Sequence, residues 1–231
     1  VNPRASRTIP FISKVIDIPL AKIAAQIAIG KKITDFKLNR ERNNNLIAVK
    51  KPVFPFNKFP KQNIFLSPEM KSTGEVIGLD KHLGGAYAKA ELGAGQSLPK
   101  HGTIFLSINN SDKISAIPIA RDFIELGFSI IATKGTAQLL TENGILVNQI
   151  YKVGEGRPNV VDAIKNQKIQ LVINTPLGAQ SRFDEYKIGQ SAIKYKIPVI
   201  TTISGAQAAI RGIRNIKSNS IQYHSLQEIF S

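Results

Sequence analysis

Basic, hydroxyl and amide side chains follow the short apolar runs in the second half of the chain, where they could hold a phosphorylated ligand. They are Lys113, Thr133, Thr136, Lys152 and Asn174. The turn 133–136 opens a helix-like segment, so free backbone N–H groups, hydroxyls and the positive end of the helix dipole would suit a phosphate monoester. Lysine attracts phosphate, and an Asn amide suits a base or ribose edge. The pattern predicts a nucleotide site; the alternative is that Thr133 and Thr136 only cap the helix.

The elements that would position these residues are short apolar runs alternating with helix-period segments. The runs expected to be strands are 103–108, 129–132, 147–153, 170–173 and 198–201. Strands joined by helical crossovers form a parallel, two-faced sheet, which predicts a doubly wound α/β fold. In such a sheet the ligand lies at the carboxyl ends of the strands.

The first part of the chain lacks this alternation of predicted strands and helices. We expect an irregular lead over residues 1–13, then a helix through Leu20 and Ile27 with Asp17 near its start and Gly30 near its end. A Pro/Phe-rich stretch, 52–60, is expected to be a loop or strand edge. A second helix is expected over 83–92, followed by a Gly/Pro-containing boundary at 95–99. This predicts two domains, 1–94 and 95–231.

The composition narrows the class of protein. The net charge of +15 divides into +9 for residues 1–94 and +6 for residues 95–231, without a basic block, so we expect no nucleic-acid partner. No apolar run is long enough for a membrane helix, and we expect no membrane partner. The absence of cysteine excludes disulfides and thiolate zinc sites and fits a cytoplasmic location.

Four motifs, in order, carry a resemblance to a known family. They are 2–8 (NPRASRT), 55–60 (PFNKFP), 68–76 (PEMKSTGEV) and 155–158 (EGRP). Together they closely resemble the large subunit of carbamoyl-phosphate synthase. The first three resemble the last part of its second ATP-grasp half, and the remainder resembles its regulatory domain, which has the methylglyoxal-synthase-like fold.

The resemblance implies an enzyme that, as a full assembly, makes carbamoyl phosphate from bicarbonate, glutamine-derived ammonia and two ATP for pyrimidine and arginine synthesis. It implies Asn2 as a ligand of Mg2+ or Mn2+, and Arg4 and Arg7 as residues facing the transferring phosphate. ATP and the metal would be bound mainly by parts of the subunit outside this chain. The partners implied are the small glutamine amidotransferase subunit and the remainder of the large subunit, and this fragment alone is expected to be inactive.

The resemblance also implies effector sites. The residues that match contacts for the inhibitor UMP or the activator IMP are Ser107, Lys113, Thr133, Thr136, Lys152, Asn174 and Thr175. Pro176 replaces a threonine found in some members. Glu75 and Thr201 match contacts for the activator ornithine, but Val199 and Ile200 stand where ornithine-responsive members have a tyrosine and an aspartate, which argues against ornithine activation.

Two alternatives remain open from the sequence. The same fold serves methylglyoxal synthase, a lyase, for which Glu155 is the obvious candidate base. The chain could also be a stand-alone nucleotide-binding or assembly module of a split subunit.

Overall fold

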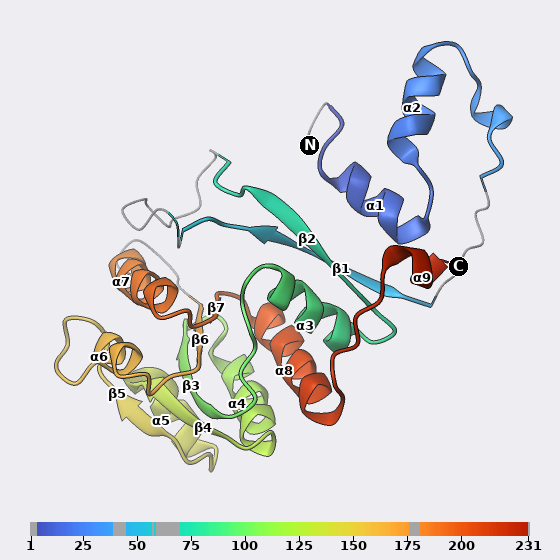
Figure 1. Cartoon of the computed structure of the whole chain (residues 1–231). Coiled ribbons are helices and arrows are strands. Elements are labelled where there is room, and N and C mark those ends of the chain that lie inside the picture. Colours follow the sequence, from blue (N-terminus) through green and yellow to red (C-terminus); the bar gives the residue numbers. More distant parts are fainter. Residues whose placement is uncertain (1–3, 39–44, 57, 59–69, 176–180, 231) are drawn as a thin grey trace.

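The computed structural model describes residues 4–38, 45–56, 58, 70–175 and 181–230, with α7 described by its backbone over 181–183 (Figure 1). It begins with two helices, α1 (Thr8–Ile16) and α2 (Leu20–Ala28), and a short 3-10 turn, η1 (Ile33–Asp35). The prediction that residues 1–13 are irregular is therefore wrong from Thr8 onward. Pro10 does not prevent the helix, because it lies in the first turn of α1, where proline is tolerated. Asp17 ends α1 in a left-handed conformation (φ 52°) and does not start α2, whose N-cap is Pro19.

A two-stranded antiparallel ribbon follows, made of β1 (Ile47–Val53) and β2 (Gly74–Asp80). Pro52 belongs to β1 and lies opposite Glu75, so the start of the Pro/Phe-rich stretch is part of a strand. Residues 57 and 59–60 of that stretch lie outside the described ranges. The sequence did not predict β2. The predicted helix over 83–92 is confirmed as α3 (Leu83–Gly93).

The predicted parallel sheet is confirmed. Its strands are β3 (Gly102–Ile108), β4 (Phe128–Thr133), β5 (Asn148–Ile150), β6 (Leu171–Thr175) and β7 (Val199–Ile200), in the order β5-β4-β3-β6-β7, and every pairing is parallel. β5 is shorter than the predicted 147–153; Tyr151 adds one isolated bridge to Asn159.

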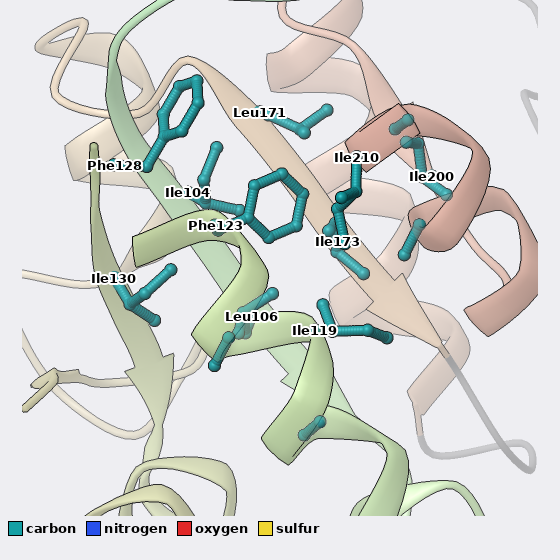
Figure 2. Packing of buried hydrophobic residues seen from close by; sticks show 14 of the residues in the cluster. Ile104, Leu106, Ile119, Phe123, Phe128, Ile130, Leu171, Ile173, Ile200 and Ile210 are labelled. Atoms are coloured by element: carbon teal, nitrogen blue, oxygen red, sulfur yellow. The ribbon is translucent and has the colours of Figure 1, made fainter. Parts of the chain in front are cut away.

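Helices cover both faces of this sheet, as the doubly wound pattern predicts. One face packs against α4 (Ala116–Glu125), which follows the 3-10 turn η2 (Lys113–Ser115), and against α5 (Lys134–Glu142) and α8 (Ile203–Ser218). In Figure 2, Ile104 and Leu106 of β3 point toward Phe123 of α4. Phe105, between them, points to the other face, where it packs with residues of α6 (Val160–Lys165) and α7 (Ser181–Lys194). The last helix is α9 (Leu226–Phe230).

Helix α3 lies between the ribbon and α8 (Figure 1). Glycines make this approach possible on both sides. A Cβ on Gly78 of β2 would overlap the Ala86 carbonyl oxygen of α3, and a Cβ on Gly84 of α3 would overlap the Arg211 carbonyl oxygen of α8. The backbones are therefore in contact across both interfaces.

Candidate functional site

The parallel register brings the strand-end residues to one edge of the sheet. Ser107 of β3 is level with Asn174 of β6, and Thr133 is the last residue of the neighbouring strand β4. Thr133, Asn174 and Thr175 are buried, although their side chains are polar. The structure thus gathers residues from three strands at the carboxyl edge that the sequence predicted.

Thr136 connects α5 to β3. Its hydroxyl is fully buried and accepts a hydrogen bond from the Ile108 N–H at 3.2 Å. Thr133 is the N-cap residue of α5 by its backbone, but its side chain makes no capping bond. Neither threonine hydroxyl therefore caps α5, which was the alternative reading of this turn.

Lys113 lies near the start of α5, and its charge interacts with that of Lys152. The Lys113 Nζ is 3.5 Å from the Thr136 hydroxyl and would be 3.5 Å from a Cβ on Gly135. Burial lowers the pKa of Lys113, and the positive charge of Lys152 lowers it further. Lys152 is exposed in the turn after β5, where its N–H donates to the Glu155 carboxylate at 3.0 Å. Like charges are costly to bring together, so this arrangement favours a bound anion.

Thr175 has a structural part at this edge. Its hydroxyl accepts from both the N–H (3.0 Å) and the side-chain amide (3.1 Å) of Asn109. The Asn109 amide oxygen in turn accepts from the Asp112 N–H at 3.0 Å. Thr175 and Asn109 therefore fix the loop that delivers Lys113, and sequence reasoning missed Asn109.

Asp184 of α7 is a further residue that the sequence did not single out. Burial raises its pKa, the charge of Lys152 lowers it, and the charge of Glu155 raises it. A carboxylate thus belongs to the same electrostatic environment as the two lysines. The sequence carried no signal for it, because its position depends on where α7 begins after β6.

The predicted catalytic and ornithine residues lie in the first part of the chain or at β7. Arg7 Nη2 donates to the Ser72 hydroxyl at 2.8 Å, and Arg7 Nε lies 3.7 Å from Glu75 Oε1. Lys50 Nζ lies 3.4 Å from the other Glu75 oxygen. Arg7 and Glu75, predicted for different ligands, are thus brought together as an ion pair.

The remaining predicted residues are not gathered with this pair. Arg4 is exposed, and its guanidinium donates to the Ala5 carbonyl oxygen at 3.0 Å. Thr201 is exposed just after β7. Asn2 and Pro176 lie outside the described residues.

Comparison with known proteins finds a matching family model and several similar relatives. Residues 115–201 match the family model described as MGS-like domain. The carbamoyl phosphate synthase large chain of Nostoc sp. (strain PCC 7120) is 51% identical over 227 residues, which cover 98% of this chain and 21% of that protein. The large chain of Archaeoglobus fulgidus is 49% identical with the same coverages, 98% and 21%. The protein named carbamoyl phosphate synthase large chain, C-terminal section, from Aquifex aeolicus is 43% identical over 252 residues, covering 100% of this chain and 47% of that one.

This chain is related to the carbamoyl phosphate synthase large chains. The resemblance found in the motifs is thereby confirmed, and the chain spans about a fifth of the length of its full-length relatives. The MGS-like match includes the buried threonines of α5 and β6, whereas Lys113 and Ser107 precede it. Of the solved structures, the crystal structure of ForH aligns with 57% of this chain and 92% of that one at a TM-score of 0.34 and 14% identity, a likeness that supports no inference.

Among the described residues, no three histidine, cysteine, aspartate or glutamate side chains come together in a way that could hold a metal ion. Within the same ranges, no helix combines the length and the apolar character needed to cross a membrane.

Proposed function

We propose that this chain is the C-terminal part of a glutamine-dependent carbamoyl phosphate synthase large chain, and that its MGS-like domain binds a nucleoside monophosphate, UMP or IMP, as a regulator. The observation that carries the proposal is the position of Lys113, whose Nζ lies 3.5 Å from the Thr136 hydroxyl in the first turn of α5. Burial lowers the pKa of Lys113, and the positive charge of Lys152 lowers it further. A phosphate monoester would relieve this repulsion and accept from the free N–H groups of the helix.

Each predicted residue has a part in this proposal. The two lysines and the Thr133 hydroxyl would hold the phosphate, and Asn174, buried level with Ser107, would face the ribose or base. Thr136 and Thr175 would act mainly by holding β3 and the loop before Lys113 in place.

Isothermal titration calorimetry of the whole chain with UMP and with IMP tests the nucleotide site. We expect saturable binding that Lys152→Ala weakens at least tenfold, because the variant removes one of two phosphate partners. Lys165→Ala, at an exposed lysine of α6, is the matched control and should bind as the parent chain does. Binding of neither nucleotide by a folded sample, or equal binding by both variants, would refute the regulatory proposal.

The catalytic part of the proposal concerns the first 94 residues, which we assign to the end of the ATP-grasp half. Arg7, held by Ser72 and Glu75, and exposed Arg4 would face the phosphoryl group that is transferred. ATP and Mg2+ or Mn2+ would be held mainly by the rest of the large subunit, and ammonia would come from the small glutamine amidotransferase subunit. Glu75 and Thr201 stay candidate ornithine contacts, although Arg7 and Lys50 already occupy the Glu75 carboxylate.

Reconstitution tests this part. The chain should co-purify with the remaining large-subunit portion and the small subunit, and carbamoyl phosphate formation should require all three. Arg7→Lys in the reconstituted enzyme should lower kcat by about 100-fold or more, as loss of a donor to developing charge does. Full activity of the Arg7→Lys variant would exclude the role assigned to this guanidinium.

Asp184 favours one alternative enough to test it. A lyase acting on a triose phosphate needs a carboxylate beside its phosphate pocket, and Asp184, with its raised pKa, shares the environment of Lys152. Methylglyoxal release from dihydroxyacetone phosphate, lost in Asp184→Asn, would support the lyase. No release from a chain that binds UMP or IMP would leave the regulatory function standing alone.

A further inference from the structure

A basic hollow lies away from the carboxyl edge of the sheet. Its volume is about 410 Å3, and it forms where the start of α3 meets the last turns of α8 and the first residue of β1. Basic side chains from two separate elements line it: Lys81 and His82 before α3, and Arg211 and Arg214 on α8.

The charges in this hollow are only partly compensated. Arg214 lies 3.4 Å from Asp122 and 3.3 Å from Glu125, so its charge is matched. Lys81 and Arg211 are exposed and form no ion pair with any side chain in the described ranges. They leave two positive charges facing a concave surface.

The nearest carboxylate does not neutralise these two cations. Asp80 precedes Lys81 in the chain, but its carboxylate lies 2.8 Å from Lys89 Nζ and accepts from the His82 N–H at 3.0 Å. The Asp80 carboxylate also lies against the first turn of α3, because a Cβ on Gly85 would be 2.5 Å from Asp80 Oδ2. An added anion would meet Lys81 and Arg211 without displacing an existing pair.

Backbone donors add to the side chains. Helix α3 has eleven residues, no side-chain cap and no acidic residue in its first turn, and its residues Leu83 and Gly84 line the hollow. The N–H groups of a first turn have no partner inside the helix, so they can donate to an anion. Leu83 and Ile47 provide an apolar wall beside them.

We propose that this hollow binds a small phosphorylated molecule, with its phosphate between Lys81 and Arg211 and close to the first turn of α3. The site is separate from the proposed effector site and does not depend on it. Because its cations come from the β2–α3 junction and from α8, a ligand there would join the ribbon and the MGS-like domain through a shared anion.

Backbone NMR of the whole 15N-labelled chain, titrated with inorganic phosphate at constant ionic strength, tests the site. We expect saturable shifts of the Leu83 and Gly84 amide signals. Arg211→Gln and Lys81→Gln should each weaken the binding reported by these signals about fivefold, as an exposed ionic contact does. Lys22→Gln, on exposed α2, is the matched control and should change nothing.

The titration is repeated with Lys152→Ala, which impairs the effector site and leaves the hollow intact. Shifts at Leu83 and Gly84 that persist in this variant would support the inference. Absence of shifts up to about 50 mM phosphate, or shifts that are equal in Arg211→Gln and the parent, would overturn it. UMP or IMP binding measured on the same samples would still report on the effector site, so the two proposals fail separately.

Discussion

The ion pair that joins the ribbon to α3 allows the sharpest stability prediction. Lys51 Nζ of β1 lies 2.5 Å from Glu91 Oε1 of α3 and 3.1 Å from Gln96 Oε1. The Glu91 side chain is only 4% exposed and that of Lys51 24%. Burial raises the pKa of Tyr87, and the Glu91 carboxylate raises it further. The Tyr87 hydroxyl is hydrogen-bonded to Glu91, so Tyr87 stays a neutral donor to this carboxylate.

Lys51→Met keeps the aliphatic part of the side chain and removes the charge. A buried carboxylate that loses its cation costs about 3–5 kcal/mol of folding free energy, and we expect the lower end, about 3 kcal/mol, because Tyr87 still donates to Glu91. The double variant Lys51→Met/Glu91→Leu should regain most of this loss, since an apolar pair of similar volume has no charge to desolvate.

Urea unfolding, followed by far-ultraviolet circular dichroism, measures the free energy of unfolding in each variant. Arg214→Met is the matched control: its side chain is 49% exposed and pairs with carboxylates that are 43% and 72% exposed, so it should cost less than about 1 kcal/mol. If Lys51→Met lowers the free energy of unfolding no more than Arg214→Met does, burial of Glu91 does not decide how much the Lys51–Glu91 ion pair contributes to stability.

Three further predictions use the same unfolding measurement. Gly84→Ala should cost about 2–3 kcal/mol, because its methyl group would overlap the Arg211 carbonyl oxygen, whereas Gly74→Ala, with open space around it, should cost far less; equal costs would contradict close α3–α8 packing. Thr136→Val should cost about 1–3 kcal/mol by leaving a buried N–H of β3 without its acceptor, and a neutral result would show that water replaces the hydroxyl. Asn159→Ala removes the side chain that accepts from two N–H groups at the start of α6 and should cost about 1 kcal/mol; no loss would mean that the cap contributes nothing.

The sheet could be predicted because its strands are buried on both faces. Runs such as 104–106 (IFL) and 171–173 (LVI) are continuously apolar, which is the pattern of central parallel strands. Once the strands are placed, the carboxyl-edge rule places Lys113, Thr133 and Asn174 without further information. That part of the candidate site follows from local pattern and one topological rule.

The rest depends on contacts between residues far apart in the chain. Arg7 meets Glu75 only because α1 lies against the ribbon, and no local pattern encodes that pairing. Asp184 reaches the environment of Lys152 because of where α7 begins, and the sequence analysis did not predict that position. Helix α1 was missed because Pro10 reads as a breaker unless the first turn is already known to begin at Thr8.

Helix α3 gives the proposed regulation a physical route. The predicted boundary between residues 94 and 95 separates α3 from the sheet along the chain, yet α3 contacts both β2 and α8 backbone to backbone. A movement of α8 cannot be absorbed by side-chain rearrangement at Gly84, so it must shift α3 and with it the ribbon. The ribbon carries Glu75, which pairs with Arg7 at the start of α1. If a nucleotide biases the position of α8, the occupancy of the site near Arg7 must bias nucleotide affinity by the same free energy. A loosened α3–α8 contact should therefore weaken both directions of coupling together while leaving the residues at the carboxyl edge of the sheet, and nucleotide binding to the isolated chain, unchanged.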